Sequence, residues 1–139
     1  MKAGLSSNFQ LSIYNKFSMN QLPNKYNLEE RTAKFGEDII DFCKGLKQDS
    51  ISKPLINQLV RSGTSIGANY MEANSGSSKK DFRNKIFICK KEAQESKHWL
   101  RMIVKYFPDN KDAVDKLWQE CQELTMIFQK ITSSIDKSN

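Results

Sequence analysis

Apolar residues recur at alternating steps of three and four positions in four long segments, and this spacing constrains the fold more than any other feature. A step averaging about 3.5 residues places the apolar side chains on one stripe of a helix that packs near-parallel to other helices. The stripes are Leu28, Thr32, Phe35, Ile39, Phe42, Leu46; Ile56, Leu59, Gly63, Ile66, Tyr70, Ala73; Phe82, Ile86, Cys89, Ala93, Ser96, Leu100, Ile103, Phe107; and Val114, Leu117, Cys121, Leu124, Phe128, Ile131, Ile135. Because the connections are short, the sequence predicts an all-α fold, an antiparallel up-down-up-down four-helix bundle.

Capping and helix-breaking residues indicate where these helices begin and end. The predicted boundaries are a start at Asn27, an end near Asp49 and Ser50, a first turn at Pro54, a start at Ser78 with Asp81, an end at Pro108 and a cap at Asp109 or Asn110. A chain of 139 residues is expected to form one domain. We predict a bundle over residues 28–135 and a C-terminal tail over residues 136–139.

Residues 1–27 keep no sustained apolar period and are predicted to form a flexible arm. The alternative is a short strand or helix that docks on a partner, because Phe9, Leu11, Ile13, Tyr14 and Phe17 are apolar. This arm contains three lysines and no acidic residue.

Few residues in the chain are suited to catalysis or metal binding. Cys43, Cys89 and Cys121 lie on or beside apolar stripes without metal-ligand spacing, and there is one histidine, His98. We therefore expect core cysteines, a reducing cytoplasmic location, no metal or cofactor and no enzymatic activity. The sequence also lacks the run of about 18 apolar residues that a membrane span needs.

Positive charge is concentrated in the third helical segment. The net charge of the chain is +6, and residues 79–105 alone hold nine basic residues and three acidic ones. One face of this helix is predicted to present Lys80, Arg83, Lys90, Lys91, Lys97, Arg101 and Lys105. Such a face favours contacts with the phosphates of RNA or DNA. The alternative is a solvated charged surface, and the sequence shows no clear aromatic platform of the kind found in single-strand binders.

The third helix also has a second apolar ridge, away from its core stripe. On a helical projection this ridge contains Ile88, Trp99, Met102 and Tyr106, with Glu92 and Glu95 among them. Since one bundle core cannot bury two faces of one helix, we predict a subunit interface here; the alternative is a scatter of exposed side chains. Gly63 and Gly67 lie four apart in the second helix, which indicates close approach by another helix, and we assign them to the same interface.

The second helix carries four polar residues on the face opposite its core stripe. Arg61, Ser65, Asn69 and Glu72 are spaced so that they could bond to one another in a ladder. We predict a structural polar network buried against a neighbouring subunit, rather than an active site. The alternative is an ordinary polar helix surface.

Several of these residues together resemble a known family. They are Gln58, Leu59, Arg61, Ser62, Gly63, Thr64, Ser65, Ile66, Gly67, Ala68, Asn69, Glu72 and Ala73, then Ser78, Lys79, Lys80, Asp81 and Phe82, and later Glu92, Ala93, Glu95, Trp99 and Leu100. Over about residues 28–135 the chain resembles the bacterial four-helix bundle proteins encoded in intervening sequences of large-subunit ribosomal RNA genes. It is more distantly similar to the accessory variability determinant of diversity-generating retroelements.

This resemblance implies a positively charged, ring-like homopentamer that binds RNA or DNA, and it implies no catalytic residues. We therefore expect a nucleic-acid-binding accessory protein that uses the basic face of its third helix. The alternative is a structural or protein-interaction module that docks another protein.

Overall fold

The computed structural model describes residues 28–76 and 78–138. The predicted arm of residues 1–27, with its cap at Asn27, lies outside these residues. The described chain forms α2 (Leu28–Lys44), α3 (Ser52–Asn74), α4 (Lys79–Tyr106), the short 3-10 helix η1 (Pro108–Asn110) and α5 (Lys111–Ser138).

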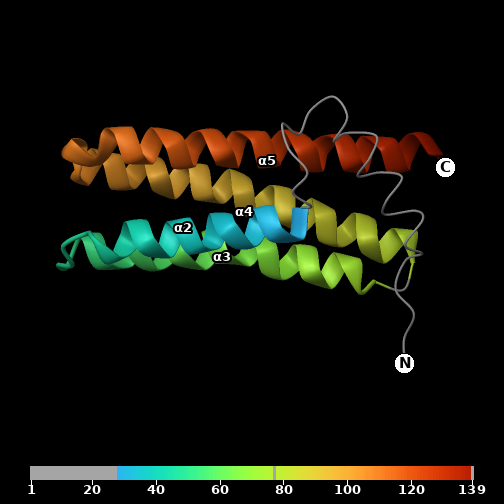
Figure 1. The fold of residues 1–139 in the computed structure, drawn as a ribbon, viewed down its shortest axis with the longest axis horizontal. Coiled ribbons are helices and arrows are strands. Elements are labelled where there is room, and N and C mark those ends of the chain that lie inside the picture. The colour runs from blue at the N-terminus through green and yellow to red at the C-terminus, as the bar shows by residue number, and fades with distance from the viewer. Residues whose placement is uncertain (1–27, 77, 139) are drawn as a thin grey trace.

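The four long helices run side by side, and each reverses the direction of the one before it (Figure 1). In this view α2 lies along α3 and α4 lies along α5, so the molecule consists of two helical hairpins packed together. The predicted all-α four-helix bundle is confirmed.

The predicted helix starts and ends agree with the structure in some places and differ in others. At the start of α4, Ser78 Oγ accepts a hydrogen bond from the Asp81 N–H at 3.1 Å, as predicted. α2 ends at Lys44, earlier than expected, because the next N–H groups bond three residues back, Gly45 to Phe42 and Leu46 to Cys43. α5 continues to Ser138, so residues 136–138 are helical where we expected a tail.

Side chains from all four helices build the core along the predicted stripes. The buried members include Phe35 and Ile39 on α2, Ile86 on α4 and Phe128 on α5, and only Phe42, Phe107 and Leu117 of the stripe residues stay partly exposed. The three cysteines are buried and unpaired, as expected for core residues. Burial raises the pKa of the Cys43 thiol to about 11, that of Cys89 to about 12, and that of Cys121 further.

Gly63 and Gly67 allow α2 to lie close to α3. A Cβ on Gly63 would come within 2.9 Å of Ile39 Cγ1, and a Cβ on Gly67 would lie 3.4 Å from the Thr32 backbone. This contact explains both glycines within one chain, and the subunit interface at them stays a prediction. The close helix that they indicated is α2 of the same chain.

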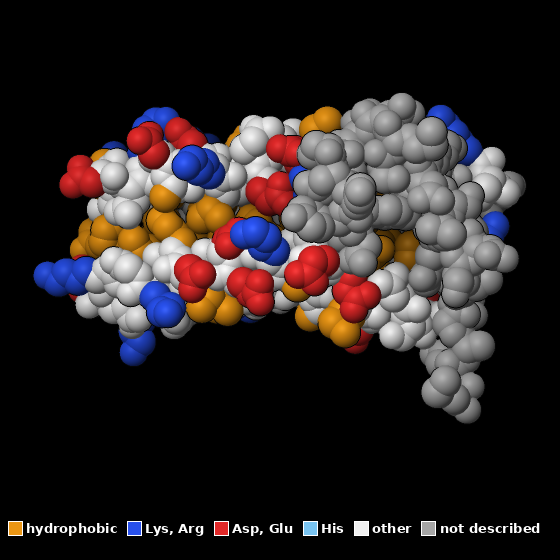
Figure 2. All heavy atoms as spheres, viewed as in Figure 1, with side chains coloured by type: hydrophobic (Ala, Val, Ile, Leu, Met, Phe, Trp, Pro, Cys, Tyr) orange, Lys and Arg blue, Asp and Glu red, His pale blue; other side chains and the backbone are white. Residues whose placement is uncertain are grey.

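Arg31, in the first turn of α2, connects this helix to α5. Arg31 is only 12% exposed and bonds to both Glu120 and Glu123, at 2.8 and 3.0 Å. These hydrogen bonds, Glu120 first, raise the pKa of the guanidinium. Figure 2 shows this α2–α5 face, on which acidic and basic side chains are mixed and apolar side chains appear between the two helices.

Asp49 stabilises the loop between α2 and α3 through hydrogen bonds. Its carboxylate accepts hydrogen bonds from the N–H groups of Ser52 and Ile51, each at 2.9 Å, and from the Tyr106 hydroxyl at the end of α4, at 2.7 Å. The Ser52 bond first, and then the Tyr106 bond, lower the pKa of Asp49 to about 2.

We therefore expect Asp49→Asn to reduce the loss of stability on acidification. Because the folded pKa is lower than the unfolded value of about 3.9, the carboxylate stabilises the fold above that value, and this contribution is lost as the pH falls toward 2. Urea unfolding between pH 5 and pH 2 should show a shallower decline for the variant than for the unmodified chain. Asp109→Asn is the control, and parallel declines for all three proteins would contradict the prediction.

Candidate nucleic-acid interface

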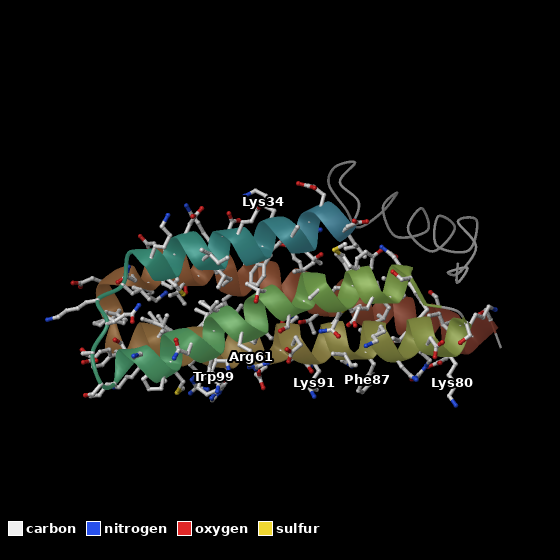
Figure 3. All side chains as sticks on the ribbon, turned by 90° about the horizontal axis from the view of Figure 1, so that it is seen from below. Lys34, Arg61, Lys80, Phe87, Lys91 and Trp99 are labelled. Atoms are coloured by element: carbon white, nitrogen blue, oxygen red, sulfur yellow. The ribbon has the colours of Figure 1, made fainter. Side chains whose placement is uncertain are left out.

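The basic residues of α4 divide into two groups according to where their side chains lie. Lys80, Lys91, Arg101 and Lys105 are exposed, and within the described residues none of them forms an ion pair. Figure 3 shows Lys80 and Lys91 projecting away from the bundle along one edge of α4, on the side opposite Lys34 of α2. These four residues supply positive charge that no described acidic side chain neutralises by contact.

The second group bonds to residues of α5 and consists of Arg83, Lys90 and Lys97. These three residues are spaced by seven positions, so they lie on one side of α4 at every second turn. Their partners on α5 have the same spacing: Asp136 for Arg83 at 2.7 Å, Gln129 for Lys90 at 2.6 Å and Gln122 for Lys97 at 2.6 Å.

The chemistry of these partners decides how much charge remains for a ligand. Asp136 holds Arg83 through two hydrogen bonds, which raise the pKa of the arginine and lower that of the carboxyl. Lys90 and Lys97 bond to amides, which carry no charge, so these two partners do not neutralise the lysines. Of the seven predicted binding residues, Arg83 is thus the one whose charge is neutralised by a partner within residues 28–76 and 78–138.

Two exposed aromatic rings lie among these lysines. Phe87 on α4 is 50% exposed, and the Lys90 Nζ lies 5.4 Å from its ring centroid. Trp118 on α5 is 39% exposed, and the Lys97 Nζ lies 5.1 Å from its ring centroid. The sequence prediction missed both rings, although each could have been found as an aromatic residue outside the core stripe of its helix.

The acidic residues of the third helix lie on its other flank, against α3. Glu92 is only 6% exposed and accepts a hydrogen bond from Arg61 of α3 at 2.9 Å, and Glu95 pairs with the same arginine. Figure 3 shows Arg61 on the side of α3 that faces α4. A buried hydrogen bond of 2.8 Å between Ser96 and Ser62 lies beside this ion-pair cluster. The basic side chains of α4 consequently remain on its outer edge and on the flank that faces α5.

The four polar residues predicted to bond in a ladder on α3 do not bond to one another's side chains. Ser65 Oγ donates to the Arg61 carbonyl at 2.5 Å, and the Asn69 amide donates to the Ser65 carbonyl at 2.8 Å. Glu72 pairs with Lys85 of α4 at 3.3 Å. The charged members therefore connect α3 to α4 within one chain, and no neighbouring subunit is needed to satisfy them.

The predicted second ridge of α4 is also partly engaged within the chain. Trp99 is partly buried and packs against the core, Ile88 and Met102 are partly buried, and Tyr106 donates its hydroxyl hydrogen to Asp49. With Glu92 and Glu95 paired to Arg61, the ridge offers less free surface than the helical projection predicted.

No group of three or more His, Cys, Asp or Glu side chains able to hold a metal occurs within residues 28–76 and 78–138. None of the helices in this part of the chain is long and apolar enough to cross a membrane. What remains distinctive on the described surface is the α4–α5 face, which combines lysines, exposed arginine and two aromatic rings.

Comparison with known proteins agrees with the resemblance in the sequence. The model of a family described as 23S rRNA-intervening sequence protein matches residues 24–130. A solved structure with similar fold is that of a protein with unknown function from the S23 ribosomal protein family, from Bacteroides thetaiotaomicron VPI-5482. It has a TM-score of 0.69 and 27% identity, over 76% of this chain and 98% of that chain. A search of curated proteins finds no match. Since the matched residues include all of α2, α3 and α4 and most of α5, the chain belongs to the 23S rRNA-intervening sequence protein family.

Proposed function

We propose that this protein is a non-enzymatic accessory protein that binds RNA or DNA through the basic side chains of α4. The observation that carries the proposal is the separation of charge on this helix: Glu92 and Glu95 are bound to Arg61 on the α3 flank, whereas Lys91 and Arg101 are exposed without ion pairs among the described residues. Phosphate contacts need such a cationic surface and little else.

The proposal includes self-association in the cytoplasm. A homopentamer, which the family resemblance implies, would repeat the basic face around a ring and strengthen the attraction for a polyanion. Gly63 and Gly67 pack against α2 of the same chain, so they lend no support to a particular interface of such a ring.

The test is a double charge reversal, Lys91→Glu with Arg101→Glu. Both side chains are exposed, so the change should leave the fold intact while it removes two phosphate contacts. We expect affinity for unrelated RNA and DNA sequences to fall about tenfold at low salt. The slope of log affinity against log salt should flatten by about one unit for each residue. Fluorescence anisotropy across a salt series measures both quantities.

The matched control is Lys34→Glu with Lys44→Glu, which changes the net charge equally on exposed residues of α2. Light scattering on the same samples measures whether the oligomer is preserved. If the unmodified protein bound no nucleic acid at low salt, or if the two double variants lost affinity equally, the protein-interaction alternative would be favoured.

A further inference from the structure

The two exposed rings on the α4–α5 face lie beside the cations that would hold a nucleic acid backbone. Phe87 is flanked by Lys90 and Lys91, and Trp118 faces Lys97. An exposed aromatic face beside positive charge is the combination that proteins use to stack the bases of a nucleic acid strand while holding its phosphates. Here, both are exposed next to positive charge.

Phe87 and Trp118 lie at different positions along the length of the α4–α5 face. Phe87 and Lys97, the residue above Trp118, are ten positions apart on α4, which corresponds to about 15 Å along the helix. Lys90 lies between them on the same flank and bonds to Gln129 of α5. A flexible polyanion following these lysines would therefore meet one ring after the other.

The shape of the face decides between single-stranded and duplex ligands. α4 packs against α3 on one flank, through Arg61 and Glu92, and against α5 on the other, through Lys90 and Gln129. α4 therefore presents its outer strip, with the exposed ring of Phe87, to a ligand. In a duplex the base faces are stacked on one another, so neither ring could reach them. In a single strand the base faces are free to stack on aromatic side chains.

We infer that Phe87 and Trp118 are base-stacking platforms and that the ligand of this face is single-stranded nucleic acid, an inference that rests on the proposed function. Lys90 and Lys97 have flexible side chains, so each amine can move from the ring to a neighbouring phosphate when a base stacks on that ring. The contacts are made to base faces, which all bases possess, so binding is tolerant of sequence.

The experiment compares Phe87→Ala and Trp118→Ala with the unmodified protein on three fluorescent ligands: oligo(dT), oligo(rU) and a blunt duplex of equal phosphate number. We expect each substitution to weaken binding to single strands about tenfold and to change duplex binding less than twofold. Trp118→Phe should keep most of the affinity, because phenylalanine retains a ring. Equal loss on dT and rU is expected for stacking, whereas loss on rU alone would identify RNA as the ligand.

Met126→Ala is the matched control, since Met126 is an apolar α5 residue of similar exposure, 47%. Single-strand affinity that is unchanged in both aromatic variants, or that falls equally in Met126→Ala, would overturn the inference. If the unmodified protein still bound nucleic acid with a steep salt dependence in that case, the proposed function would stand without it. Absence of binding to all three ligands would overturn both.

Discussion

Gly63→Leu is expected to destabilise the protein by about 3 kcal/mol, which corresponds to a melting temperature about 10 °C lower. A Cβ at this position would already lie 2.9 Å from Ile39 Cγ1 and 3.2 Å from its Cγ2. Ile39 is fully buried and branched at Cβ, so it has no free rotamer to turn into. Leucine does favour a helix over glycine, by about 1 kcal/mol, but this gain is smaller than the cost of separating α2 from α3.

Ala68→Leu is the control for this experiment, because Ala68 is exposed on the same helix and its substitution should change stability by less than about 0.5 kcal/mol. Urea unfolding at one protein concentration measures both variants. Equal stabilities would mean that α2 does not need the close approach that the glycines allow.

Arg61→Ala should cost about 2 kcal/mol, since it leaves the buried Glu92 carboxylate without its basic partner. Removing one member of a buried ion pair typically costs 3–5 kcal/mol, and the value here is reduced because Arg61 itself is half-exposed to water. Glu95 would lose the same partner. Chemical denaturation gives the free energy of unfolding.

A double-mutant cycle with Glu92→Gln separates the ion pair from the lost packing of the arginine stem. The loss caused by Arg61→Ala should shrink when the carboxylate has already been replaced. Lys34→Ala is the reference for an exposed pair, because Lys34 bonds to Asp38 at the surface. An Arg61→Ala cost no greater than that of Lys34→Ala would show that water replaces Arg61 freely.

The helices themselves were predictable because their apolar spacing is regular and their packing depends on it. The end of α2 was less predictable, since it is fixed by the hydrogen bonds of the Gly45 and Leu46 N–H groups. The start of α3 depends on the Asp49 carboxylate, which accepts hydrogen bonds from the N–H groups of Ile51 and Ser52. Such local bonds leave no periodic pattern in the sequence.

The sequence predicted which residues form the basic face, but not which helix packs against each of the other faces of α4. A helical projection places Glu92 and Trp99 on a face of α4, yet it cannot say whether α3 or another subunit lies there. The same limit applies to Gly63, for which the close helix proved to be α2. The basic face could be recognised without knowing its neighbours, whereas the partner of Arg83 could not, because Asp136 on α5 lies 53 residues further along the chain.

The buried cysteines can serve as probes of local opening in the bundle. One thiol lies in α2, one in α4 and one in α5, at Cys43, Cys89 and Cys121. Cys89 and Cys121 are fully buried and their pKa values are raised, so an alkylating reagent reaches them only when their helices open. Cys43 lines a surface pocket between α2 and α3 and serves as the more accessible reference. Labelling followed by peptide mass measurement would therefore time the opening of α4 and α5, with and without nucleic acid, in the unmodified protein.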